Sequence, residues 1–305
     1  MIRALLVAAA LASPAFAEGF TTEQAIRSQP LDLPPPASEA LEFRGALVLS
    51  PPFTEFGGLS GLVVEAGGAA TAVSDRGRWL RFRLIVEDGR LIGAEGAATA
   101  TILYRHGRPL PGEAGDAEGL ARDPRTGRYF VSFEGWHRIQ PYDEPGGGSE
   151  PFFLAEEWSG FARNNGIEAL AMDGDGALWA IAERGGAEAP VWVGGREGWA
   201  QKSLPLEGPY LPTGADFGPD GRLYVTERAF SLVGGFRFRL RRFVYGDGAE
   251  PESVETLLQY GAETRIDNIE AISIWREGDE TLLLIASDDN FLPLQANVLA
   301  LFAVR

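Results

Sequence analysis

The sequence contains no cysteine, and it contains only two histidines among its 305 residues. The lack of cysteine excludes disulfides and thiol chemistry, and together with the scarcity of histidine it makes a zinc site an unfavoured interpretation. The chain also lacks the G-x-S-x-G turn, the phosphate-binding P-loop and the glycine fingerprint of dinucleotide-binding folds. Hydrolytic chemistry in this chain is therefore expected to depend on carboxylates and a metal ion.

Long apolar runs are also missing, since no stretch of about 18 apolar residues occurs, and we expect no membrane insertion. The short apolar segment from Ala4 to Ala12 follows Arg3 and precedes Ala15-Phe16-Ala17. This pattern predicts a secretory signal peptide over residues 1–17 and a periplasmic or secreted protein that starts near Glu18.

Positive charge is the third deficit, because 27 Lys and Arg residues face 43 Asp and Glu residues, for a net charge of -16. So acidic a chain is not expected to bind nucleic acid, and it attracts cations better than polyanions. We expect a monomer that acts on a small molecule.

A repeated unit fills most of the chain. Each copy has an apolar run with a polar residue near its start, a turn rich in Asp and Gly, and a second apolar run that ends on an acid. The marker positions of the first runs are residues 60, 118, 168, 216 and 270, which are spaced by 58, 50, 48 and 54 residues. Such spacing predicts an all-β fold, a single β-propeller in residues 41–305 with five blades, six remaining possible.

The two ends of the predicted propeller complement each other. The last repeat ends with an apolar run over residues 298–304 and lacks a fourth strand, whereas residues 41–50 read as a strand without a blade. We therefore expect the N-terminal strand to close the ring, which also removes a sheet edge. Residues 18–40 contain four prolines and are predicted to form an extended, unpaired leader.

The repeats place acidic residues in two rings. The first ring is expected to converge at the channel mouth, where crowded carboxylates are tolerable if a cation lies between them. Calcium is the most suitable divalent cation, because it takes six to eight oxygen ligands. The predicted metal ligands are Glu118, Glu168, Asp216, Glu270 and the amide of Asn268, with Ser60 at the equivalent place in the first copy.

The second ring lies at the ends of the second strands. It consists of Asp75, Glu134, Glu183, Glu227 and the Asp288-Asp289 pair. We name Asp75, Glu227 and Asp288 as candidates for a general base or a substrate contact, and His137 as a further catalytic candidate beside a rim acid. The alternative is that these acids accept hydrogen bonds from loop amides or pair with the arginines that follow three of them.

These motifs, taken together, resemble one family. Seven segments are similar to the bacterial phytase-like family, "esterase-like activity of phytase": Gly58-Leu59-Ser60-Gly61-Leu62, Ser74-Asp75-Arg76-Gly77, Asp116-Ala117-Glu118-Gly119-Leu120, Asn165-Gly166-Ile167-Glu168-Ala169-Leu170, Asp220-Gly221-Arg222-Leu223-Tyr224-Val225-Thr226-Glu227-Arg228, Asp267-Asn268-Ile269-Glu270-Ala271 and Ser287-Asp288-Asp289-Asn290-Phe291. The resemblance covers roughly residues 40–305. It implies an exported propeller hydrolase of phosphate or carboxylic esters.

The sequence thus leads to two hypotheses of different class. The first is a metal-assisted ester or phosphoester hydrolase with its site at the channel mouth. The second is a non-catalytic periplasmic propeller that binds a ligand or a protein and holds a structural ion or none. Metal-dependent turnover that is lost when ring acids are changed separates the two.

Overall fold

The computed structural model describes residues 19–110, 112–162, 166–231, 235–261, 263–264, 266, 268–291 and 295–305. The predicted signal peptide, residues 1–17, lies outside this described part, as does the predicted start at Glu18. Within the described part, no helix is long and apolar enough to cross a membrane.

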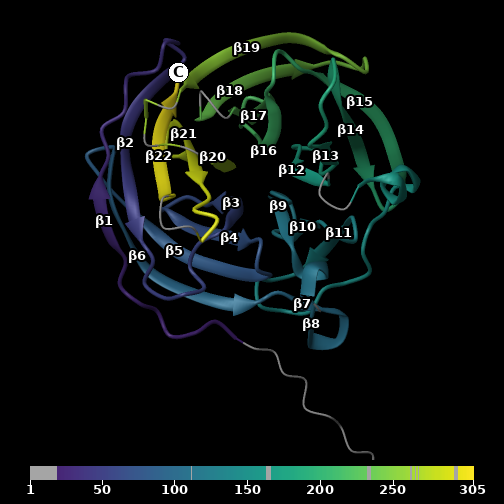
Figure 1. Cartoon of the computed structure of the whole chain (residues 1–305), viewed down its shortest axis with the longest axis horizontal. Coiled ribbons are helices and arrows are strands. Elements are labelled where there is room, and N and C mark those ends of the chain that lie inside the picture. The colour runs from purple at the N-terminus through teal and green to yellow at the C-terminus, as the bar shows by residue number, and fades with distance from the viewer. Residues whose placement is uncertain are drawn as a thin grey trace, which may run out of the picture.

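Five antiparallel sheets surround a central axis like the blades of a propeller (Figure 1). The innermost strands are β3, β9, β12, β16 and β20, and each contacts the innermost strand of the blade on either side of it. The prediction of an all-β propeller with five blades is therefore confirmed.

The blades follow the order of the chain. Blade 1 contains β3 (Leu59–Val64), β4 (Ala69–Ser74), β5 (Arg78–Glu87) and β6 (Arg90–Thr101). Blade 2 contains β9 (Ala117–Arg122), β10 (Tyr129–Phe133) and β11 (Arg138–Tyr142). Blade 3 contains β12 (Ile167–Met172), β13 (Leu178–Ala182), β14 (Glu188–Gly195) and β15 (Gly198–Pro205). Blade 4 contains β16 (Leu211–Phe217), β17 (Leu223–Ser231), β18 (Gly235–Tyr245) and β19 (Pro251–Tyr260).

Blade 5 joins the two ends of the described chain. It contains β20 (Ile269–Glu277), β21 (Glu280–Ser287) and β22 (Asn297–Val304), and β2 (Leu41–Ser50) pairs with β22 as its fourth strand. Closure of the ring by the N-terminal strand is thus confirmed. The expectation of an unpaired leader is wrong, because β1 (Arg27–Pro30) pairs with β2 as a fifth strand. The prolines are compatible with this placement, since β1 is an edge strand.

Between blades 1 and 2 the chain forms a small hairpin, β7 (Leu103–Tyr104) and β8 (Arg108–Pro109), with 3-10 turns η1 (Arg105–Gly107) and η2 (Gly112–Gly115). Blade 2 has no fourth strand in the described residues. Phe153 makes a single bridge to Ile139, and the 3-10 helix η3 (Glu156–Gly160) follows. In place of a fourth strand, residues 151–154 therefore contribute one bridge.

The second strands of the blades are buried on both faces, because each blade packs between two others. All five residues of β13 are buried, as are all five of β10. This explains why these strands read as continuous apolar runs and not as an alternating pattern.

Each innermost strand carries a β-bulge at the same place, where one extra residue opposes the second strand. The next residue is always small, as Gly61, Gly119, Ala169, Gly214 or Ala271. A Cβ at Gly214 would lie 2.6 Å from the carbonyl oxygen of Glu270 on the adjacent blade. The repeat therefore needs a small residue here so that neighbouring inner strands can approach each other around the channel.

Candidate active site at the channel mouth

The bulged residues form the first ring of polar side chains. They are Ser60, Glu118, Glu168, Thr213 and Glu270, one from each blade. Ser60, Glu168 and Glu270 line a constriction of about 10 Å³, which is close to the space of one water molecule. A bulge re-aims a side chain, and here it aims one from every blade at the axis.

Thr213, not Asp216, occupies the ring position of blade 4, so the sequence alignment of this copy is wrong by three residues. Asp216 lies further along β16, where its carboxylate accepts hydrogen bonds from the backbone N–H groups of Phe217 and Ile274, at 2.8 and 2.7 Å. Asp216 therefore ties blade 4 to blade 5 and does not lie with the other predicted ligands.

The second ring begins one residue beyond the paired end of each second strand. The backbone N–H groups of Asp75, Glu134, Glu183 and Asp288 donate to the carbonyl oxygens of residues 58, 116, 166 and 268 on the inner strands. In blade 4 the matching pair is Leu211 and Arg228. The second ring therefore contains four acids and one arginine, and the placement of Glu227 in it is wrong by one residue.

That single residue moves the side chain to the other face of the strand. Glu227 is fully buried inside blade 4, where its carboxylate accepts hydrogen bonds from the guanidinium groups of Arg239 and Arg241. Arg239 and Arg241 are themselves buried, so this ion pair belongs to the interior of blade 4.

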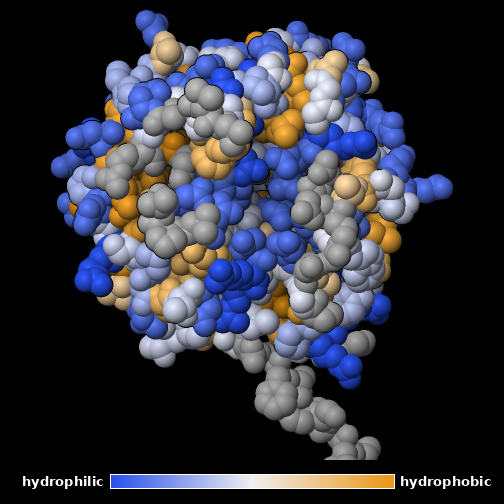
Figure 2. All heavy atoms as spheres, in the orientation of Figure 1, coloured by the Kyte–Doolittle hydropathy of each residue, from blue (hydrophilic) through white to orange (hydrophobic). Residues whose placement is uncertain are grey.

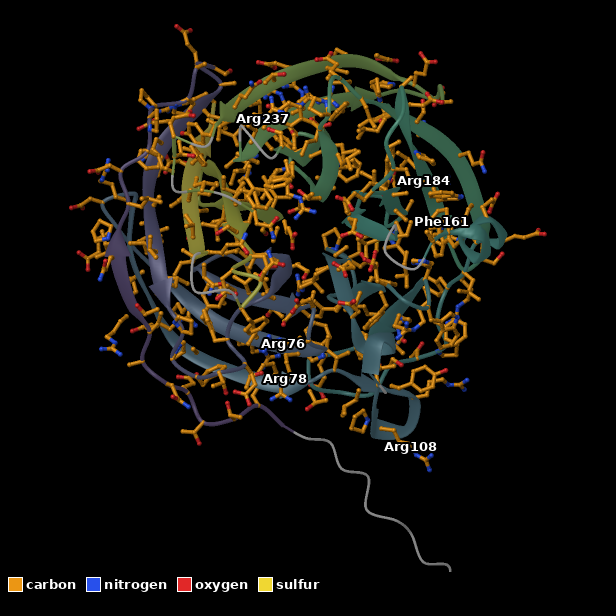
Figure 3. The ribbon with its side chains drawn as sticks, viewed as in Figure 1. Arg76, Arg78, Arg108, Phe161, Arg184 and Arg237 are labelled. Atoms are coloured by element: carbon orange, nitrogen blue, oxygen red, sulfur yellow. The ribbon has the colours of Figure 1, made fainter. Side chains whose placement is uncertain are left out.

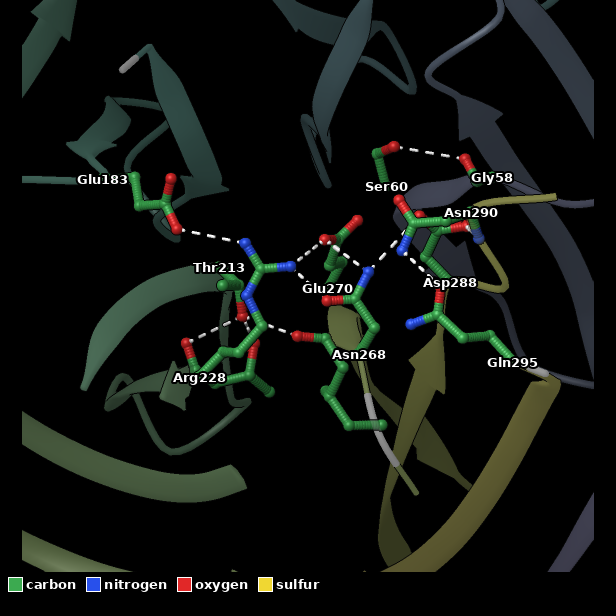
Figure 4. Close-up of polar contacts among 12 residues, drawn as sticks. Gly58, Ser60, Glu183, Thr213, Arg228, Asn268, Glu270, Asp288, Asn290 and Gln295 are labelled. Atoms are coloured by element: carbon green, nitrogen blue, oxygen red, sulfur yellow. Dashed lines mark hydrogen bonds and ion pairs between the residues drawn. The ribbon is translucent and has the colours of Figure 1, made fainter. Parts of the chain in front are cut away.

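Arg228 is the one basic member of the second ring, and it neutralises one side of the mouth (Figure 4). Its guanidinium donates to Glu183 at 3.1 Å and to both Glu270 and the side-chain oxygen of Asn268. The amide of Asn268 in turn donates to Glu270 at 2.8 Å. Two predicted metal ligands, Asn268 and Glu270, are therefore held by an internal cation.

The opposite side of the mouth has no such partner in the described structure. Oxygen atoms of Asp116, Glu118 and Glu134 lie within 4.8 Å of one another, close enough to share one ion. Glu134 is also hydrogen-bonded to Glu168. Sequence reasoning did not select Asp116, although Asp116 stands two residues before Glu118 as Asn268 stands before Glu270.

These carboxyl groups are shifted toward their neutral forms. Burial, reinforced by the neighbouring charges of Asp75 and Glu134, raises the pKa of Asp116 to about 6. Burial and the neighbouring carboxylates hold the pKa values of Glu118 and Glu168 well above their usual range. Burial also raises the pKa of Glu270 to about 7, against the opposing effect of Arg228. The negative charge at the mouth therefore exceeds what the protein itself compensates.

Blades 1 and 5 contribute three further acids with different roles. Burial raises the pKa of Asp288 to about 8, and it raises the pKa of Asp75 as well. Asp289 accepts hydrogen bonds from the backbone N–H groups of Gly58 and Phe291 and from the amide of Asn297. Asp289 thus anchors loops, as the alternative interpretation expects, whereas Asp75 and Asp288 lie at the mouth.

His137 lies beside the mouth and not in it. It is 8% exposed, and its Nε2 donates to the carbonyl oxygen of Ala162 at 3.0 Å. Burial lowers the pKa of the imidazole, so the ring is neutral at neutral pH. A Cβ on Gly166 would lie 2.9 Å from Nδ1 of His137 and 3.0 Å from Cγ of Glu134, which places the histidine close behind this acid.

Hydrophilic side chains gather in the hollow at the centre of this face (Figure 2). Around it lie Arg76, Arg184 and Arg237, which come from three blades (Figure 3). None of the three forms an ion pair with a carboxylate of the described residues. The guanidinium of Arg76 instead stacks on Phe291, 3.2 Å from the ring centroid, and that of Arg184 lies 5.4 Å from the ring of Phe161.

The family model described as "Phytase-like: Esterase-like activity of phytase" matches residues 54–291. The chain belongs to this phytase-like family. No curated protein matches the chain.

The chain is also similar to several solved structures. They include a PQQ-bound aldose sugar dehydrogenase from Streptomyces coelicolor, with 15% identity, a TM-score of 0.45 and coverage of 88% of this chain and 100% of that one. The α-L-arabinofuranosidase PaAbf62A from Podospora anserina has 12% identity, a TM-score of 0.47 and coverage of 85% and 95%. The hydrazine synthase of Kuenenia stuttgartiensis has 12% identity, a TM-score of 0.43 and coverage of 80% and 71%.

Proposed function

We propose that this phytase-like propeller hydrolyses phosphate or carboxylic esters with the help of a divalent cation, calcium being the most suitable. The observation that carries the proposal is the group of Asp116, Glu118 and Glu134, whose oxygens approach within 4.8 Å without a basic partner in the described structure. Uncompensated, partly buried carboxylates are costly to maintain, and they are typical of functional sites.

The donor set suits the proposed ion. Calcium prefers carboxylate and carbonyl oxygens at 2.3–2.6 Å, and three oxygens within 4.8 Å of one another can lie at that distance from one centre. When bound, a divalent cation polarises an ester oxygen and lowers the pKa of bound water. Asp116, Glu118 and Glu134 would hold the ion, with Glu168 hydrogen-bonded behind them.

Other residues of the mouth have separate parts in this proposal. Asp288, with its pKa raised to about 8 by burial, keeps a proton near neutral pH and can donate it to a leaving group. Asp75, at the mouth beside it, is the candidate for a base or a substrate contact. Arg76 and Arg184 form no ion pair with a carboxylate in the described part of the chain, and they are candidates for contact with an anionic group such as a phosphate.

One observation favours the non-catalytic alternative. Arg228 neutralises Glu183 and Glu270 without any ion, which is what acids with a purely structural role require. Under that interpretation the remaining acids share protons or hold an ion that activates nothing.

The deciding experiment is an activity screen on metal-stripped protein. Carboxylic esters, lactones and phosphomonoesters are offered before and after calcium, magnesium, manganese or zinc is added. We expect turnover that requires the metal and is lost in Glu118→Gln, while Glu252→Gln, at an exposed position of β19, retains it. The hydrolase proposal fails if no ester is turned over with any of these metals.

A further inference from the structure

The missing fourth strand of blade 2 leaves a cavity of about 400 Å³ beside the channel mouth. It is lined by Gly135, Trp136, His137, Leu154, Ala155, Glu156, Trp158, Ser159 and Phe161. The lining comes from the turn after β10 and from η3 with its flanking residues, the segment that stands where the other blades have a regular outer strand. The cavity volume is within the range of small-molecule sites.

Its walls are unusually apolar for a surface feature. Trp136 is 43% exposed and Leu154 is 48% exposed, and they are two of the six exposed large hydrophobic residues in the described part of the chain. Trp136 is held in place, because its ring makes aromatic contacts with Tyr104 and with Phe152, at centroid distances of 6.5 and 4.8 Å. An exposed but fixed indole is a ready stacking surface for another ring.

The charge of the lining selects against anions. Among the described lining residues Glu156 is the only charged side chain at neutral pH, since burial keeps the His137 imidazole neutral. No lysine or arginine is among the described lining residues, and the guanidinium groups of Arg138 and Arg184 lie against the rings of Trp136 and Phe161, 4.8 and 5.4 Å from the centroids. Glu156 therefore disfavours a phosphate or carboxylate in the cavity. An uncharged ring would bury apolar surface against Trp136, Trp158 and Phe161.

The cavity adjoins the acidic cluster. Its wall residue His137 and the cluster acid Glu134 approach Gly166 from two sides, within about 3 Å of the place where a Cβ would be. Phe161, whose ring contacts that of His137 at a centroid distance of 5.5 Å, lies under the guanidinium of Arg184, which is next to Glu183 of the second ring. The wall of the cavity is therefore adjacent to residues that hold the acidic cluster.

We propose that this cavity is a subsite for an uncharged aryl group, so that aryl esters are the favoured substrate class of the mouth. The inference of a substrate class rests on the proposed hydrolase function. The binding of the ring itself does not depend on that function, because it requires neither the metal nor turnover.

The first test measures binding in the presence of a chelator. 2-Naphthol serves as the neutral aryl probe and 2-naphthoate as its anionic counterpart, with affinities taken from ligand-observed NMR titrations. We expect 2-naphthol to bind the wild type more tightly than 2-naphthoate, and Trp136→Ala to weaken 2-naphthol binding about tenfold. Ile92→Ala is the matched control, because Ile92 is also 48% exposed but lies on β6 of blade 1.

Leu154→Ala provides a second variant in case the first fails to fold, and melting curves check both. The inference is overturned if wild type and Trp136→Ala bind 2-naphthol equally, or if 2-naphthoate binds as tightly as 2-naphthol. A loss confined to Trp136→Ala and Leu154→Ala supports it.

The second test compares 2-naphthyl acetate with ethyl acetate as substrates of the calcium-loaded protein. We expect Trp136→Ala to lower kcat/KM for the aryl ester about tenfold and to leave the alkyl ester unchanged. An equal effect on both esters contradicts the substrate class. If no ester is hydrolysed at all while 2-naphthol still binds through Trp136, the hydrolase proposal fails and the aryl site stands.

Discussion

Glu227 and Arg228 are neighbours on β17, yet they belong to charge sites of opposite character. Glu227 is fully buried within blade 4 and meets two buried arginines, Arg239 and Arg241. Arg228 points to the channel mouth, where it is the only basic residue in a second ring with four acids. The first site is compensated by the protein itself, and the second is not.

The difference separates charges that are paired within the protein from charges that we propose to be functional. A buried ion pair whose partners are complete fixes the strands that carry it, and removal of one partner leaves an unpaired buried charge. An acidic cluster without enough basic partners instead keeps protons or attracts a cation, which is what a binding or catalytic site requires. Four experiments test this contrast.

Glu227→Gln is expected to destabilise the protein by about 3–5 kcal/mol, because it leaves Arg239 and Arg241 buried without a counter-charge. Urea unfolding measures the change. Glu207→Gln is the control, since Glu207 approaches Arg239 only at 3.7 Å and is 72% exposed, and little change is expected. Equal stabilities of the two variants would show that the blade 4 pair is not structurally important.

Calcium is expected to stabilise the wild type by about 2.7 kcal/mol at a hundredfold excess over its Kd, and a chelator should remove this gain. Glu118→Gln should lose most of the gain, because it removes one of the three clustered carboxylates. Glu252→Gln should retain it. Thermal melts with and without calcium provide the measurement, and identical melts of chelated and calcium-saturated wild type would contradict the metal site.

Arg228→Gln is expected to lower the stability of the chelated protein by about 2 kcal/mol, because Glu183 and Glu270 lose their charged hydrogen-bond donor. The freed carboxylates should also tighten calcium binding. Isothermal titration calorimetry of wild type and variant measures the calcium affinity. Unchanged or weaker binding in the variant would mean that the charge of Arg228 does not act on the calcium site.

Asp216 sharpens the comparison as a buried acid that forms no ion pair with an arginine among the described residues. Burial raises its pKa from 3.8 to about 7, so its contribution to stability is complete below about pH 4 and is lost as the pH rises through about 7. The free energy of unfolding of the wild type should therefore fall by about 1.4 kcal/mol per pH unit between these values, whereas that of Asp216→Asn should not. Urea midpoints from pH 4 to 8 measure it, and parallel curves for wild type and variant would refute the assignment. Calcium binding should be the same in both.

The fold was predictable from the sequence because every copy repeats the same order of apolar run, turn and acid. The five-bladed ring and its closure by β2 follow from that order, and both are confirmed. The site was predictable only in part. Glu118, Glu168, Glu270, Asn268, Asp75 and Asp288 do meet at the mouth, whereas Asp216 and Glu227 do not.

The first-ring residue of blade 4 is predicted wrongly because the repeats are aligned on their acidic residues. Alignment on the residues that the backbone geometry requires gives the right position. The small residue after each bulge is the stricter marker, because the adjacent inner strand leaves no room for a Cβ at Gly61, Gly119 or Gly214. Alignment on Gly214 places Thr213 in the first ring. In the same register, Leu211 at the start of β16 pairs with Arg228, which places Arg228 in the second ring.

The sequence by itself determined the repeat, the five blades and the concentration of acids at one end of the channel. The tertiary structure decided which of those acids have a basic partner and which do not. Arg228 reaches Glu183 and Glu270 across 45 and 42 residues of chain, and Glu227 finds its arginines on the next strand. The bulges determine on which face of the sheet each side chain lies. One position along β17 therefore separates Glu227, in an interior ion pair, from Arg228, at the channel mouth.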